Sequence, residues 1–227
     1  MSVKSLSKEA NSLRLDALPD IYFDVRSRRW RYRDSHQFAP MAAVRARATK
    51  YRGEQVGAMK RLVSRYSDGK LTLDEFQREA AQTLKSIHLA EMIRALDKQG
   101  QATGDKFLIV GRNLKEQYYS GIDRISDRRF GLKYLAQDIA DGKVSPAMLQ
   151  HRIGLFAQSG KKTYWETKTN INRGSGKTEA RRILAPAEHC RECINYSRRG
   201  WMAIADIIPP TVACSCRTNC KCTLEFR

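Results

Sequence analysis

The first 189 residues of this 227-residue chain contain no cysteine, because all six cysteines lie between Cys190 and Cys222. A disulfide framework or a thiolate metal site is therefore excluded from most of the chain. Acidic residues are also scarce: 24 Asp and Glu stand against 42 Lys and Arg, which gives a formal net charge of +18. Such an imbalance opposes self-association and favours a polyanionic partner, namely DNA, RNA or an anionic membrane surface.

Long apolar runs are absent as well. No run approaches the roughly 20 residues needed to span a bilayer, so we expect no membrane partner. The start, Met1 to Leu15, is polar and charged and has none of the apolar core of a secretory signal. We therefore expect the chain to be made in a reducing cytoplasm, where clustered cysteines hold metal more often than they form disulfides.

Catalytic signatures are missing too. Gly176-Lys177-Thr178 is similar to the end of a phosphate-binding loop, but Ile171 stands where that motif requires glycine. No Ser, His and Asp constellation stands out, and the carboxylates that a nuclease would need are scattered through basic surroundings. The sequence predicts a protein without enzymatic activity.

The cysteines that are present form one C-x-x-C pair and two C-x-C pairs. These pairs are Cys190 and Cys193, Cys214 and Cys216, and Cys220 and Cys222. A C-x-x-C turn aims two thiolates at one point, and a close pair about twenty residues on can complete a tetrahedral zinc site. The residues between them leave room for a strand, a turn and a second strand, as in a zinc ribbon. His189 is expected only to flank the first pair.

Two explanations of the cysteine pattern stay open, beside a third in which the cysteines are simply free thiols. A structural Zn²⁺ is favoured, because a catalytic site keeps an open position and mixes in histidine or carboxylate. Disulfides are the alternative, since six sulfurs exceed the four that one zinc ion needs. Both explanations predict a small tail held together by its cysteines.

The N-terminal part predicts a β-hairpin followed by a basic helix. Alternating apolar residues near Ile21 and Trp30, separated by a polar turn, favour two paired strands with Trp30 and Tyr32 on one face and arginines on the other. This surface either binds nucleic acid or is a solvated hairpin whose aromatics pack on a neighbouring element. The candidate nucleic-acid contacts are Arg26, Arg28, Arg29, Arg31, Arg33, Arg45, Arg47, Lys50 and Arg52.

The middle of the chain reads as a series of amphipathic helices. Thr72 and Glu75 form a capping box, Ser145 and Pro146 form an N-cap and first-turn pair, and Gly69 suits a helix C-terminus. The predicted helices span residues 41–66, 72–99, 107–119, 128–139 and 145–169.

These patterns together predict a mainly α fold. We expect a helical body of antiparallel helices, an N-terminal β-hairpin and a small cysteine-rich, zinc-ribbon-like β tail. The predicted parts are an arm and hairpin at 1–40, the helical body at 41–169, and a basic linker with the metal-binding tail at 170–227.

Several motifs follow one another in the C-terminal part of the chain. They are Arg152, Phe156-Ala157, Thr163-Tyr164, Glu179 to Leu184, His189-Cys190-Arg191-Glu192-Cys193, Gly200, Pro209-Pro210 and Asn219 to Leu224. From about Gly142 to Arg227 this order resembles the minor head, or head morphogenesis, proteins of tailed bacteriophages, the Mu F-like group. That group typically closes with His-x-x-Cys-x-Cys. Its histidine falls here on Arg217, which cannot bind metal, although Cys216 stands beside it.

The resemblance implies a ligand set and a role. The implied metal ligands are Cys190, Cys193, Cys216, Cys220 and Cys222. The implied role is a structural, non-enzymatic virion protein at the portal vertex or head interior that assists head assembly or genome packaging and delivery. Expected partners are portal or capsid proteins, in a multi-copy assembly, and genomic DNA. The alternative is a zinc-ribbon protein that binds nucleic acid outside any particle.

Overall fold

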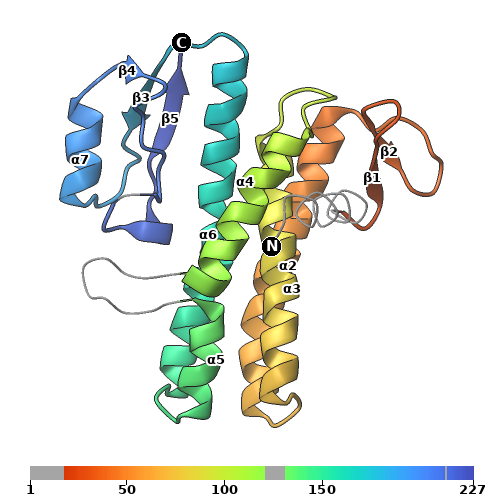
Figure 1. The fold of residues 1–227 in the computed structure, drawn as a ribbon, viewed down its shortest axis with the longest axis vertical. Helices are drawn as coiled ribbons and strands as arrows, with labels where there is room; N and C mark the ends of the chain where they lie inside the picture. The colour runs from red at the N-terminus through yellow and green to blue at the C-terminus, as the bar shows by residue number, and fades with distance from the viewer. Residues whose placement is uncertain (1–17, 121–130, 213) are drawn as a thin grey trace.

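The computed structural model describes residues 18–120, 131–212 and 214–227. It confirms a mainly helical chain with an N-terminal hairpin and a cysteine-rich C-terminal region (Figure 1). The strands are β1 (Ile21–Asp24), β2 (Arg29–Tyr32), β3 (Glu179–Ile183), β4 (Met202–Ala203) and β5 (Thr223–Phe226). The α-helices are α2 (Met41–Ser67), α3 (Leu73–Ala95), α4 (Gly104–Lys115), α5 (Leu132–Ala140), α6 (Pro146–Gly174) and α7 (Arg191–Arg198).

Helices α2 and α3 form an antiparallel pair because the turn between them carries its own start and stop signals. Gly69 adopts a positive φ of 70° at the end of α2. At the start of α3, Glu75 N donates to Thr72 Oγ1 at 3.2 Å and Thr72 N donates to Glu75 Oε2 at 2.8 Å. This confirms the predicted capping box.

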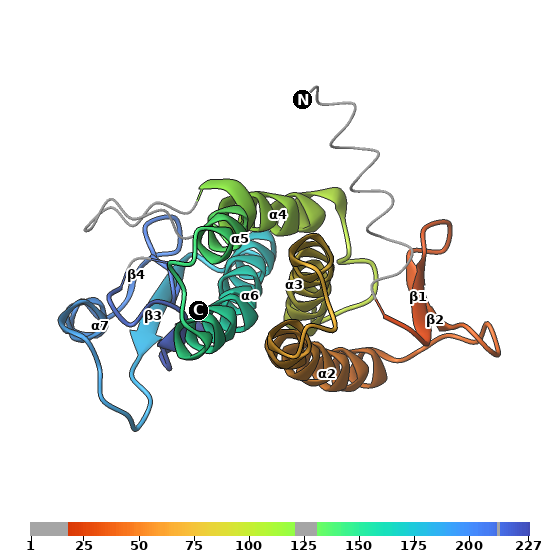
Figure 2. The ribbon, with the colours of Figure 1, turned by 90° about the horizontal axis from the view of Figure 1, so that it is seen from below.

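Two apolar cores hold the helical body, which consists of α2 to α6. One lies at the hairpin end and includes Trp30, Ala48 and Phe107. The other joins α2, α3, α5 and α6 around Phe76 and Leu84. Figure 2 shows α6 between the α2 and α3 pair on one side and the C-terminal strands on the other.

The hairpin confirms the predicted strand pair and decides which way it faces. Phe23 pairs with Trp30 across the two strands, with ring centroids 5.2 Å apart. Trp30 is 1% exposed and belongs to the core shared with α2, α3 and α4. Its ring therefore anchors the hairpin on the helices and is not available to stack on a nucleic-acid base.

Several predicted helix ends differ from the observed ones. Helix α3 ends at Ala95 rather than near Gln99, and α6 continues to Gly174 rather than ending near Thr169. Helix α4 continues into a π-helical turn, η1 (Glu116–Ser120). The first residues of the predicted 128–139 helix lie outside the described part of the chain. Within the described part, α5 starts at Leu132. Because α6 runs so far, it carries the chain almost directly into β3.

The C-terminal module, residues 179–227, is a three-stranded antiparallel sheet in the order β4-β3-β5 with α7 beside it. Arg182 pairs with Leu224 in the β3–β5 register. The expected strand, turn and strand between the cysteine pairs is wrong, because this segment forms α7 and the short β4. A four-residue apolar cluster, Ala180, Ile204, Ile207 and Leu224, packs against Trp165 of α6.

No helix in the described part of the chain combines the length and the apolar content that crossing a bilayer requires.

Helices α3 and α6 lie close together at Gly160, where there is no room for a side chain. A Cβ at this position would lie 2.8 Å from Ile87 Cγ2 and 3.0 Å from Glu91 Cγ. We expect Gly160→Ala to lower the free energy of unfolding by about 1–3 kcal/mol through overpacking, as measured by urea denaturation.

Gly154 on the same helix is the matched control, because a Cβ there would have nothing within 4 Å. Gly154→Ala is expected to stabilise the chain by up to about 1 kcal/mol through helix propensity. Equal effects of the two substitutions would contradict the close approach of α3 and α6.

Candidate metal centre

Three short elements and the loop between them bring the cysteines together. Cys190 precedes the first residue of α7, and Cys193 lies in its first turn. Cys216 and Cys220 flank the 3₁₀ turn η2 (Arg217–Asn219), and Cys222 directly precedes β5. The pairing of β5 with β3 therefore draws the last cysteines toward the start of α7.

The six sulfurs form two overlapping groups. Within each group the Sγ atoms all lie within 4.8 Å of one another. The first group is Cys190, Cys193, Cys214 and Cys216, and the second is Cys193, Cys220 and Cys222. All six cysteines are free thiols, and the Cys193 and Cys220 sulfurs are 3.6 Å apart, well beyond the disulfide bond length of about 2.05 Å. The structure thus places the thiols at metal-binding distances and shows no disulfide among them.

His189, which was expected only to flank the first cysteine pair, offers a nitrogen ligand beside the sulfurs. Its Nε2 donates to the carbonyl oxygen of Ala185 at 2.6 Å. This hydrogen bond leaves Nδ1 as the acceptor nitrogen, and Nδ1 lies 3.6 Å from Cys222 Sγ. A histidine that ligates metal usually donates its other ring N–H to a carbonyl or carboxylate in this way.

Arg182 places a buried positive charge against the sulfurs. It is 1% exposed, and its Nη1 donates to Cys193 Sγ at 3.6 Å. Its Nη2 donates to the carbonyl of Ile208, and its guanidinium lies 4.6 Å from the centroid of the Tyr196 ring. The salt bridges among the described residues include none to Arg182, so its side-chain contacts there are a thiol sulfur, a backbone carbonyl and an aromatic ring.

The thiols differ in pKa because they share hydrogen bonds. The thiol of Cys214 donates to Cys220, which lowers the pKa of Cys220 to about 4 and raises that of Cys214. Burial raises the pKa of Cys193. Burial also opposes ionisation of Cys190, but hydrogen bonds from Cys193 N–H and Cys216 bring its pKa to about 7. A metal that binds these sulfurs must therefore displace protons from the thiols whose pKa is raised.

The five cysteines expected as one ligand set do not share one centre. Cys190 and Cys216 belong to the first group, Cys220 and Cys222 to the second, and Cys193 to both. Cys214 joins the first group and was absent from the predicted set. The signal for Cys214 was its place in a C-x-C pair, and the signal for His189 was its position next to Cys190.

Four of the nine predicted nucleic-acid contacts are engaged in ion pairs within the chain. Arg31 Nε lies 3.0 Å from Asp24 Oδ2, and Arg52 Nε lies 3.0 Å from Glu91 Oε1. The other two pairs are Arg45 with Asp97 and Arg47 with Asp20. The Arg31 pair joins the two strands of the hairpin, whereas the other three pairs tie α2 to the residues before β1, to α3 and to the segment after α3.

The other five predicted contacts are exposed. Arg26, Arg28 and Arg29 surround the hairpin turn, and Arg29 lies 4.6 Å from the centroid of the exposed Phe38 ring. Arg33 follows β2, and Lys50 lies on α2. The structure thus groups the exposed candidates mainly at one end of the molecule, where the hairpin turn projects (Figure 1).

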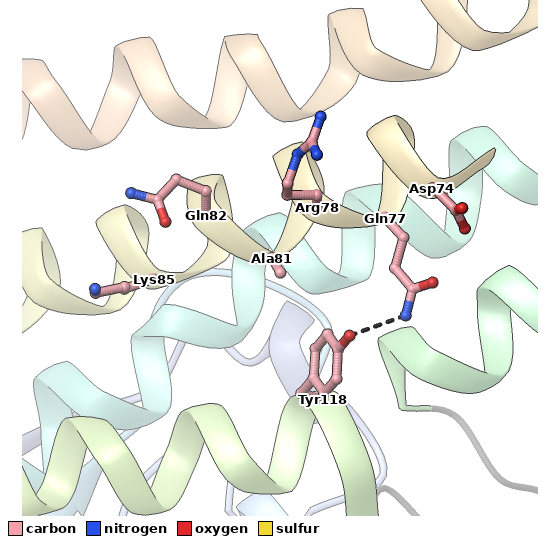
Figure 3. Close-up of a pocket in the computed structure, with 7 residues that line it drawn as sticks. All are labelled: Asp74, Gln77, Arg78, Ala81, Gln82, Lys85 and Tyr118. Atoms are coloured by element: carbon pink, nitrogen blue, oxygen red, sulfur yellow. Dashed lines mark hydrogen bonds between the residues drawn. The ribbon is translucent and has the colours of Figure 1, made fainter. Parts of the chain in front are cut away.

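A surface hollow lies between α3 and η1 (Figure 3). Gln77 donates its side-chain amide to Tyr118 Oη at 2.9 Å across it. The lining residues are Asp74, Gln77, Arg78, Ala81, Gln82, Lys85 and Tyr118. They include a single carboxylate and neither a thiol nor an imidazole.

No protein-family model, no curated protein and no solved structure matches this chain.

Proposed function

We propose that this chain is a structural minor head protein of a tailed phage. In this proposal it lies at the portal vertex or head interior, assists head assembly or genome packaging and delivery, and uses zinc to hold its C-terminal module. It contacts portal or capsid proteins as one of several copies.

The observation that carries the proposal is the convergence of the phage-like motifs in one module. Arg182 from β3, Cys193 from α7, and Cys220 and Cys222 from the last loop lie together in a buried cluster. These motifs are dispersed over more than forty residues of sequence. Their meeting supports a shared structural purpose, since the group they resemble places the same motifs in the same order.

The choice of zinc rests on the donor set. Thiolates at close spacing suit a tetrahedral, redox-inactive ion with Zn–S distances of about 2.3 Å. Such an ion stabilises a small module without supplying an open catalytic position. The net charge of +18 and the exposed arginines at the hairpin turn support contact with packaged DNA.

Mass spectrometry of purified particles and procapsids tests the phage role. We expect the chain in at least one of them, and its absence from both would overturn the role. Cys190→Ser is expected to reduce incorporation into particles by loosening the module, while the helical body stays folded. Asn195→Ala, at an exposed position on α7, is the matched control and should be incorporated normally.

A free nucleic-acid-binding protein is the second candidate, and the exposed arginines Arg26, Arg28 and Arg29 favour it. Sequence-specific binding by the isolated chain would select this candidate over the first. Its affinity should fall steeply with salt, because each neutralised phosphate releases counterions. Affinity that barely changes between low and moderate salt would count against it.

A further inference from the structure

We propose that the C-terminal module binds two metal ions that share the Cys193 thiolate as a bridging ligand, with His189 completing the second centre. The inference rests on the metal-binding part of the proposed function and is independent of the phage role. It assigns one metal ion to each of the two sulfur groups, so that all six cysteines act as metal ligands.

The first centre is complete in sulfur alone. Cys190, Cys193, Cys214 and Cys216 supply four Sγ atoms that all lie within 4.8 Å of one another. A tetrahedral site with Zn–S bonds of about 2.3 Å has S···S edges of about 3.8 Å. A modest contraction around one ion would therefore bring these four sulfurs to ligand positions.

The second centre contains three sulfurs and one nitrogen. Cys193 Sγ and Cys220 Sγ are 3.6 Å apart, close to a tetrahedral edge of about 3.8 Å. His189 Nδ1 and Cys222 Sγ are also 3.6 Å apart, as expected for the edge between a zinc-bound nitrogen and a zinc-bound sulfur, about 3.6 Å. The imidazole is not within 4.8 Å of all three sulfurs, so binding draws the ring inward.

A single-metal arrangement leaves these groups unexplained. If one ion took the four sulfurs of the first group, Cys220 and Cys222 would remain without a metal although they are only 4% and 2% exposed. The hydrogen bond to Ala185 O would still leave His189 Nδ1 as an acceptor directed at Cys222, but this nitrogen would bind no metal. Sharing Cys193, which is fully buried, gives every one of these donors a metal.

Charge also favours two ions joined through Cys193. Six thiolates and two divalent ions leave a net charge of −2, because the imidazole is neutral. The Arg182 guanidinium lies against the shared sulfur, where negative charge would gather, and it is buried beside Tyr196. A buried cation requires an anionic partner to offset its desolvation. The bridged cluster supplies that partner.

Zinc counting on the full-length chain tests the proposal. Native mass spectrometry of protein purified with Zn²⁺ is expected to find two ions per chain. His189→Gln should retain one ion under competition with a chelator, whereas His151→Gln, an exposed position on α6, should retain two. Two retained ions in the His189→Gln variant would overturn the role of His189.

Cadmium-113 NMR of the same chain, loaded with ¹¹³Cd²⁺, tests the bridge directly. We expect two resonances, one from an all-sulfur centre and one from a centre with three sulfurs and one nitrogen, split by coupling through the shared sulfur. Two uncoupled resonances would overturn the bridge. One ion per chain would overturn the second centre and leave the proposed zinc module standing, whereas no bound ion would overturn both.

Discussion

Chelation of the proposed structural zinc is expected to unfold the C-terminal module while the helical body stays folded. The module's apolar core is small, with Ala180, Ile204, Ile207 and Leu224 as its buried members. Structural zinc contributes about 10–16 kcal/mol in small metal-binding domains, far more than a few buried side chains supply. The helical body has two extensive apolar cores of its own and contains none of the cysteines.

Hydrogen exchange measured by mass spectrometry distinguishes the two parts. After chelation, the amides of α7 and of the β3–β5 ladder should exchange rapidly, while those of α2 and α3 keep their protection. Returning zinc should restore the slow exchange, and acidification should mimic chelation because it protonates the thiolates that bind the metal. A metal-free module that stays protected would show that apolar packing alone holds it.

The second large effect is expected at Glu91, a buried acid in the helical body. Its carboxylate is 1% exposed and lies between two arginines, with Oε1 3.0 Å from Arg52 Nε and Oε2 2.5 Å from Arg94 Nη1. Replacing both arginines by methionine leaves the buried acid without either of its salt-bridge partners. We expect this double variant to lose about 3–5 kcal/mol of unfolding free energy.

The control for this prediction is the triple variant in which Glu91 is also methionine. A buried ion cluster replaced by apolar side chains of similar volume is often neutral or stabilising. Both variants lose the bond from Arg52 to Gln158 and that from Arg94 to Thr49, so their difference isolates the stranded carboxylate. Urea denaturation followed by helical circular dichroism measures it. Equal stability of the two variants would contradict the argument.

Local sequence signals were sufficient where a helix begins with its own cap. Thr72 with Glu75, and Ser145 with Pro146, satisfy the first backbone N–H groups within a few residues, so both helix starts were predicted correctly. Gly69 and Gly142 adopt the positive φ that a helix C-terminus favours, with values of 70° and 68°. These features depend on neighbours in the sequence.

The end of α3 was missed because distant contacts determine it. The Gln99 side chain accepts from Trp30 N at 2.9 Å and donates to Ala39 O at 2.7 Å. Gln101 accepts from the backbone N–H of Asp97 at 2.7 Å. The Gln101 bond is local, but the two Gln99 bonds dock the segment after α3 on Trp30 of the hairpin and on Ala39, and no local pattern in the sequence encodes them.

The same distinction applies to the charged residues. The sequence supplied the excess of basic residues, and it predicted a polyanionic partner from that excess. It could not tell that Arg31 pairs with Asp24 or that Arg52 reaches Glu91, 39 positions away. Only the packed structure separates arginines held in ion pairs from those free to meet a phosphate.

At the cysteine-rich end of the chain, the sequence and the tertiary structure determined different things. The sequence by itself determined that all six thiols lie in one short segment and that this segment follows a basic helical body. The tertiary structure decided which sulfurs lie close together, placing Cys193 in both groups and His189 beside Cys222. The physical reason is that ligand spacing along a chain limits which donors can meet, whereas the β3–β5 pairing and the position of α7 decide which of them do.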